Sequence, residues 1–170
     1  MKIAKRSASS GETSTPPPLH FSDTPAPLPY KSRGCALSRA ERSFYEVLKR
    51  AIGDDWVVFV KMRLSDIVTV PRTTPSWQSH FNRVQSKHVD FVVCDRQQVR
   101  LALIVELDDS SHHEKSRVER DKFVDEVLGA AGLPIVHVTA RAAYSLGEVR
   151  SAVEPHLAFV PDSEAALASP

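Results

Sequence analysis

Three acidic residues interrupt or end two apolar runs that have the composition of buried β-strands. Asp90 lies within the run 89–94, and Glu106 and Asp108 lie at the end of the run that starts at residue 101. In an extended strand Glu106 and Asp108 leave the same face, with their Cα atoms about 6–7 Å apart. A hairpin between the two runs would bring Asp90 within about 5 Å of the second strand. Carboxylates this close repel one another unless a cation compensates, so the pattern predicts a site for Mg²⁺, with Mn²⁺ as the alternative.

Local signals for helices and strands surround these acids. Ser38, Ser116 and Ser145 each have a glutamate three residues later, the spacing of a capping box that starts a helix. Gly53 ends the first helix, and Gly132 ends the second. Apolar, β-branched runs predict strands over 56–60, 89–94, 101–107 and 135–139. The expected fold class is α/β, with a small mixed β-sheet flanked by helices on both faces.

Composition limits the class of protein and its domain organisation. The chain has 170 residues, 22 Lys+Arg, 21 Asp+Glu, 12 Pro and 2 Cys. We expect a Pro/Ser/Thr-rich tail over 1–30, one domain over 31–160 and a flexible tail over 161–170. No apolar run is long enough for a membrane span and no secretory signal is visible, so we expect a cytoplasmic protein without a membrane partner. Two cysteines in such a compartment predict no structural disulfide.

The spacing of these motifs resembles that of a nuclease superfamily. The motif residues lie in the segments 88–92, 104–112, 120–121 and 132–136. This pattern resembles the PD-(D/E)XK nuclease superfamily, and within it the branch of very-short-patch-repair endonucleases. More narrowly, the segments 37–45, 60–66 and 81–90 resemble the uncharacterised bacterial family DUF2726. The resemblance covers about residues 29–140.

The resemblance implies a restriction-endonuclease-like core that binds Mg²⁺ and hydrolyses phosphodiester bonds in DNA. Asp90 and Glu106 match the metal-binding acids, and Glu41 matches a glutamate that the first helix often supplies. Asp108 stands where the superfamily usually has a lysine, and His112 matches a downstream histidine of the related branch. The expected catalytic set is therefore Asp90, Glu106, Asp108 and His112, and Asp90, Glu106, Asp108 and Glu41 are the expected metal ligands.

Basic residues in the first half of the chain could contact the phosphates of a nucleic acid. Arg83 and Lys87 are the nearest of them to Asp90 in sequence, and Lys61, Arg63 and Arg72 belong to the same basic segment. Arg117 and Arg120, which accompany the second helix, are further candidates. Trp77 and Phe81 could add base stacking or belong to a core beside a loop. Lys87 is a candidate replacement for the superfamily's lysine, although strand parity favours His88.

The missing lysine leaves two further functions open. The domain could be a catalytically degenerate nuclease fold that binds nucleic acid or a protein partner. Alternatively, it could be a regulatory module whose proline-rich tail recruits partners. Each acid also has a structural interpretation: Glu41 as a helix-capping residue, Asp90 as a residue of an irregular strand, and Glu106 with Asp108 as a solvated strand end. His112 could equally be an ordinary loop histidine.

Overall fold

A computed structural model describes residues 28–108 and 115–157 of the chain. The side chains of residues 115–121 are outside this description, as are His112 and the two predicted tails apart from residues 28–30. Residues 28–32 have no regular secondary structure and belong to a separate unit. The unit that begins at Arg33 contains the helices and strands discussed below.

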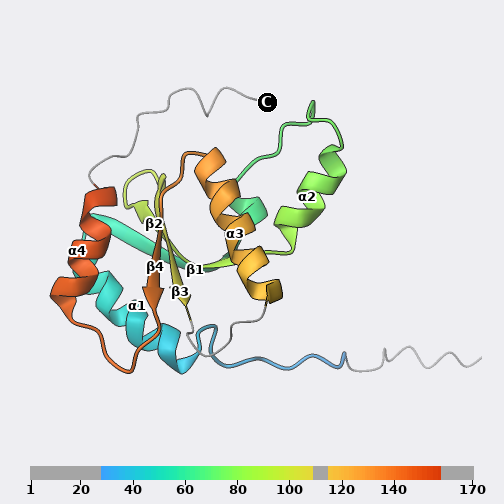
Figure 1. Ribbon diagram of the computed structural model, residues 1–170. Coiled ribbons are helices and arrows are strands. Elements are labelled where there is room, and N and C mark those ends of the chain that lie inside the picture. Colours follow the sequence, from blue (N-terminus) through green and yellow to red (C-terminus); the bar gives the residue numbers. More distant parts are fainter. Residues whose placement is uncertain (1–27, 109–114, 158–170) are drawn as a thin grey trace, which may run out of the picture. The chain divides into compact units, whose positions relative to one another are not determined.

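Four strands form one mixed sheet in the order β1-β2-β3-β4 (Figure 1). β1 and β2 are antiparallel, β2 and β3 form the expected antiparallel hairpin, and β3 and β4 are parallel. A parallel pair needs a crossover connection, and α3 provides it between β3 and β4. The elements are α1 (Arg39–Ile52), β1 (Trp56–Arg63), the 3₁₀ helix η1 (Leu64–Asp66), α2 (Trp77–Gln85), β2 (His88–Asp95), β3 (Leu101–Asp108), α3 (Lys115–Ala130), β4 (Ile135–Thr139) and α4 (Leu146–Leu157). The predicted α/β class and mixed sheet are therefore confirmed.

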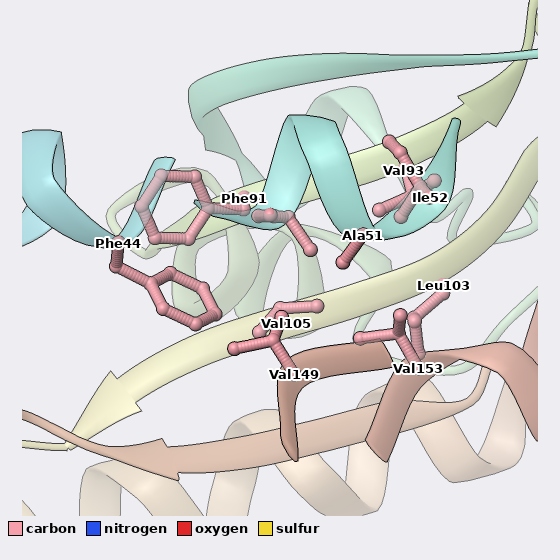
Figure 2. Close-up of a cluster of buried hydrophobic side chains, with 10 residues drawn as sticks. Phe44, Ala51, Ile52, Phe91, Val93, Leu103, Val105, Val149 and Val153 are labelled. Atoms are coloured by element: carbon pink, nitrogen blue, oxygen red, sulfur yellow. The ribbon is translucent and has the colours of Figure 1, made fainter. Parts of the chain in front are cut away.

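Apolar side chains fill both faces of the sheet, because successive residues of β2 and β3 point to opposite sides. On one face α1 and α4 pack against β2 and β3, as Figure 2 shows. This α1–α4 core consists of Phe44, Leu48, Ala51, Ile52, Phe91, Val93, Leu103, Val105, Val149 and Val153. On the other face η1, α2 and α3 contribute to the α2–α3 core: Leu64, Ile67, Val84, Val89, Val92, Cys94, Ile104, Val124 and Leu128.

The helix starts agree with their capping signals in two cases and differ in the third. Ser38 and Glu41 form the complete predicted capping box at α1, and the Ser145 Oγ accepts from the Glu148 amide at the start of α4. α3 begins at Lys115, so Ser116 lies inside the helix and is not its N-cap. The structure also contains a helix without a predicted counterpart, α2. Within the described residues no helix is long and apolar enough to cross a membrane, and Cys35 and Cys94 are both free thiols, as expected.

Candidate functional site

A lysine lies between two of the predicted acids. The Lys61 Nζ donates to Oε1 of Glu41 at 2.8 Å and to Oδ1 of Asp90 at 2.5 Å. These three side chains come from β1, α1 and β2, and each is at most about a third exposed. Burial lowers the pKa of Lys61, but the hydrogen bonds and charges of Asp90 and Glu41 outweigh it and leave that pKa above its usual value. The lysine is therefore a fixed positive charge within the cluster.

The backbone of β1 is unusual at this lysine. Lys61 has φ +54°, in the left-handed region that non-glycine residues rarely adopt. Val60 packs with the α1–α4 core, whereas Met62 packs with the α2–α3 core, although positions two apart in a regular strand share a face. The side chains of β1 therefore change from one face of the sheet to the other at Lys61. A strained position of this kind costs about 1–3 kcal/mol and is typical of functional sites.

Asp90 is the centre of the cluster, because both of its carboxylate oxygens accept hydrogen bonds. Oδ1 accepts from Lys61, and Oδ2 accepts from the backbone amide of Leu107 at 3.1 Å. The register pairs Val60 with Phe91 and Met62 with Val89, which puts Asp90 across from Lys61. On its other side, the pairing of Phe91 with Val105 puts Asp90 beside Glu106. The predicted approach of Asp90 to the strand of Glu106 is thus present in the structure.

Glu41 combines a structural and an electrostatic role. Its Oε2 accepts from the backbone amide of Ser38 at 2.8 Å, which completes the capping box, and its Oε1 accepts from Lys61. One carboxylate thus caps α1 and pairs with the lysine, so the start of α1 is tied to β1. The capping interpretation of Glu41 and its placement at the acidic cluster are both features of the structure.

Glu106 carries the strongest electrostatic perturbation among the acids. Burial, followed by repulsion from Asp90 and a hydrogen bond to it, raises the pKa of Glu106 from 4.5 to about 8. Lys61 opposes this shift without cancelling it. At neutral pH Glu106 therefore holds a proton that a solvated glutamate would have lost. A carboxyl in this state is suited to proton transfer near pH 7, or to cation binding coupled to release of its proton.

Asp108 belongs to a second group of polar side chains. Its Oδ2 lies 3.1 Å from Nδ1 of His137, and Nε2 of the same histidine lies 3.0 Å from Oδ1 of Asp125 in α3. Burial lowers the pKa of His137, but the hydrogen bonds to Asp108 and Asp125 outweigh it and raise that pKa above 6.5. His137, on β4, is the register partner of Glu106. The histidine therefore joins β3, β4 and α3 next to the acidic cluster.

The predicted nucleic-acid contacts are only partly described. The Arg83 guanidinium lies 4.0 Å from the ring centre of Phe123, and Arg83 is exposed at the end of α2. Lys87 is half-buried just before β2. The side chains of Arg117 and Arg120 lie outside the described residues, and so does His112.

The two aromatic residues of α2 take part in packing. The Trp77 ring stacks on Phe81, with Arg72 3.6 Å from its centre, and its Nε1 donates to the carbonyl of Val70. Phe81 also packs against the α2–α3 core. These contacts favour the structural interpretation of Trp77 and Phe81 over a stacking surface for bases.

Lys61 is the residue whose position could not be found from sequence. β1 and β2 are joined by a long connection, so the sequence does not indicate which residue of β1 faces Asp90. From sequence alone, Lys61 is only one of the basic residues that could contact phosphate. Among residues 28–108 and 122–157, whose side chains the structure describes, no three His, Cys, Asp or Glu side chains are grouped so that they could hold a metal ion. In this structure the ammonium of Lys61 is the cation between Glu41 and Asp90.

Comparison with known families matches residues 35–156 to one described as "Protein of unknown function (DUF2726)". The chain belongs to the DUF2726 family. The matched residues extend from just before α1 to the end of α4 and so include both polar groups. The search of curated proteins gave no match, and the search of solved structures gave none. The narrower resemblance noted in the sequence is thereby confirmed.

Proposed function

We propose that this DUF2726 domain is a Mg²⁺-dependent nuclease of the PD-(D/E)XK type that hydrolyses phosphodiester bonds in DNA. The observation that carries the proposal is the position of Lys61 between Glu41 and Asp90. The superfamily's motif places a lysine two residues after its glutamate, where this chain has Asp108. Lys61 brings an ammonium to the same acidic cluster from a different strand. In this proposal it supplies the positive charge that the motif lysine would otherwise supply at position 108.

The residues have separate roles in this proposal. Asp90 and Glu106 would hold the cation with Glu41 beside them, since carboxylate oxygens are the ligands that Mg²⁺ prefers. When bound, the cation would supply Lewis-acid stabilisation of the phosphate and a lower pKa for a coordinated water. Lys61 would stabilise the negative charge that develops on the phosphoryl oxygens. Arg83, Lys87, Arg117 and Arg120 remain the proposed phosphate contacts, His112 is the proposed helper in proton transfer, and Asp108 remains a proposed metal ligand.

Cation binding would compete with the existing hydrogen bonds. Both oxygens of Glu41 and of Asp90 already accept from protein donors, so Mg²⁺ would have to share these oxygens with Lys61 or displace its ammonium. Glu106 must release its proton, because a protonated carboxyl is a poor ligand for a cation. We therefore expect metal binding to be weak below neutral pH and to strengthen as the pH rises toward the pKa of Glu106, about 8.

The test is cleavage by purified full-length protein with Mg²⁺ or Mn²⁺. Single-stranded, duplex and nicked DNA should be compared for the wild type, Glu106→Ala, Asp90→Asn and Lys61→Met. Glu154→Ala is the matched control, because Glu154 is an exposed glutamate of α4 outside the cluster. We expect cleavage by the wild type and the control, and a loss of at least about 100-fold in the three cluster variants. Cleavage that survives Glu106→Ala and Asp90→Asn would refute the assignment.

A second function is favoured by the same ion pairs. Because Lys61 already compensates Glu41 and Asp90, the cluster is electrostatically complete without a metal, as expected of a degenerate nuclease fold that binds nucleic acid or a protein partner. Binding of labelled DNA in EDTA, without cleavage or thermal stabilisation by either metal, would support this function over the nuclease. In that case Lys61→Met should lower the melting temperature and leave DNA affinity unchanged.

A further inference from the structure

The segment 67–89, which includes α2, forms a positively charged surface next to the acidic cluster. It contains no aspartate or glutamate, and its basic and titratable side chains are Arg72, His80, Arg83, Lys87 and His88. We call these five side chains the α2 surface; all of them are exposed except Lys87, which is half-buried. The segment ends directly before Asp90, so the α2 surface adjoins the proposed cleavage site. Charges of one sign on such a surface attract a polyanion.

Two arginines of the α2 surface are held against aromatic rings. The Arg72 guanidinium lies 3.6 Å from the centre of the Trp77 ring, and the Arg83 guanidinium lies 4.0 Å from that of Phe123. Phe123 belongs to α3, which lies beside α2 in Figure 1, so Arg83 joins the two helices. Stacking restrains a guanidinium but leaves the N–H groups in its plane able to bind a phosphate in pairs. In the part of the chain that the structure describes, neither arginine is paired with a carboxylate, so both can bind an anionic ligand.

The aromatic rings of this region favour a ligand bound by its phosphates over one bound by its bases. Proteins that bind single strands present aromatic rings on which successive bases stack. The Trp77 ring instead contacts both Arg72 and the nearly parallel ring of Phe81, whose centre is 5.0 Å away. The Phe123 ring is likewise in contact with Arg83. Because these rings already have partners, the α2 surface offers restrained cations, which suit the regular phosphate backbone of a duplex.

The length of α2 determines how much of a duplex this surface can contact. Arg72 is stacked on the first residue of the helix, Trp77, and Lys87 follows the last residue, Gln85, by two positions. The nine residues of α2 rise about 12 Å from first to last. Successive phosphates of one DNA strand are about 3.4 Å apart along the duplex axis, so the helix spans roughly three to four base pairs. The two ends of the α2 surface therefore contact different phosphates.

We propose that the α2 surface anchors duplex DNA through its phosphates, with Arg72 and Arg83 as the principal contacts. The inference rests on the DNA substrate proposed above, and it adds the form of that DNA and the surface that holds it. The anchoring needs neither a metal ion nor the carboxylates of the acidic cluster, because the two arginines are restrained by Trp77 and Phe123. A lysine in place of either arginine would keep the charge and lose the planar, stacked donor group.

The test is the affinity of the full-length protein in EDTA for a labelled duplex, measured by fluorescence anisotropy between about 50 and 200 mM salt. Arg72→Gln, Arg83→Gln and the double variant are compared with the wild type. Arg150→Gln is the matched control, because Arg150 is an exposed arginine of α4, outside the α2 surface. We expect the double variant to bind at least about tenfold more weakly, and each removed arginine to lower the slope of log affinity against log salt by about 0.9. The control should bind like the wild type.

Arg72→Lys tests whether the stacked guanidinium itself matters. It should keep the salt slope of the wild type and lose affinity, and it is the second variant if Arg72→Gln does not fold in thermal melting. Unchanged affinity in the double variant, or an equal loss in Arg150→Gln, would overturn the proposal. So would a single strand of the same sequence bound as tightly as the duplex, or no binding of the duplex by the wild type up to about 0.1 mM protein. All these measurements are made in EDTA, so the α2 surface and the nuclease proposal can fail separately.

Discussion

Replacement of Glu106 by glutamine should change how the stability of the protein depends on pH. In the folded chain the pKa of Glu106 is raised from 4.5 to about 8, by burial and by Asp90. Between these two pH values the folded state holds a proton that the unfolded state has lost. Raising the pH through this range therefore lowers the free energy of unfolding. The difference between 4.5 and about 8 corresponds to at most about 5 kcal/mol.

Glutamine has the shape of the protonated glutamate and does not titrate. We therefore expect Glu106→Gln and the wild type to have similar stability at about pH 5, with the variant more stable by several kcal/mol at about pH 8.5. The measurement is urea unfolding in EDTA across this range, with the free energy of unfolding extrapolated to water. His137 also titrates nearby, but it is present in both proteins, so its contribution cancels in their difference.

The matched control is Glu154→Gln, which removes an exposed glutamate from α4. Its difference from the wild type should stay within about 0.5 kcal/mol at every pH, as is usual for surface substitutions. If the difference between Glu106→Gln and the wild type were equally flat with pH, Glu106 would not be a buried, proton-holding carboxyl. The electrostatic account of the cluster would then be refuted. Added Mg²⁺ should stabilise the wild type more at about pH 8.5 than at about pH 6, since the cation needs the ionised carboxylate.

Three further predictions concern other parts of the domain. Phe44→Ala should destabilise the protein by about 3–5 kcal/mol in urea unfolding, because Phe44 is fully buried in the α1–α4 core; a loss below about 1 kcal/mol would contradict this. His137→Gln should lose more stability relative to the wild type near pH 6 than near pH 9 in urea unfolding. The raised pKa of His137 stabilises the fold fully below about pH 6.5, and this stabilisation disappears as the pH rises through the folded pKa. Equal losses at the two pH values would disprove the pairing of His137 with Asp108 and Asp125. Cys35 should be alkylated in the native protein at about pH 8 while Cys94 stays unmodified, because burial raises the pKa of Cys94 to about 11; mass spectrometry before and after denaturation distinguishes the two thiols.

Local signals were sufficient for most of the fold. The capping box at Ser38 and the Ser145 cap are formed, and the four apolar runs are the four strands of the sheet. α2 was not predicted, because its N-cap Ser76 adopts a left-handed conformation without a side-chain capping bond, and the helix has only one buried residue, Val84. A short helix with polar residues on most positions and no start signal cannot be recognised from periodicity alone.

The candidate site was only partly predictable for a different physical reason. The proximity of Asp90 and Glu106 follows from a hairpin with a short turn, so the sequence contains enough information to pair them. The position of Lys61 depends on the register between β1 and β2, which are separated by η1 and α2. It also depends on the positive φ of Lys61, at which the side chains of β1 change from one face of the sheet to the other. No residue preference predicts this conformation, since lysine rarely adopts positive φ. Long-range pairing and local strain therefore place the residue that distinguishes this cluster.

At position 61 the left-handed backbone favours one type of residue and the neighbouring acids favour another. Glycine would adopt φ +54° without strain, so the backbone alone favours glycine at this position, whereas Glu41 and Asp90 require a positive charge there. Lys61→Gly would relieve the strain and at the same time leave two partly buried carboxylates beside a third acid without their counter-charge. Backbone strain and the ion pairs of Lys61 thus act on the stability of the fold in opposite directions at one residue. If Glu41 and Asp90 were also replaced by neutral residues, the backbone alone would favour glycine or asparagine at position 61.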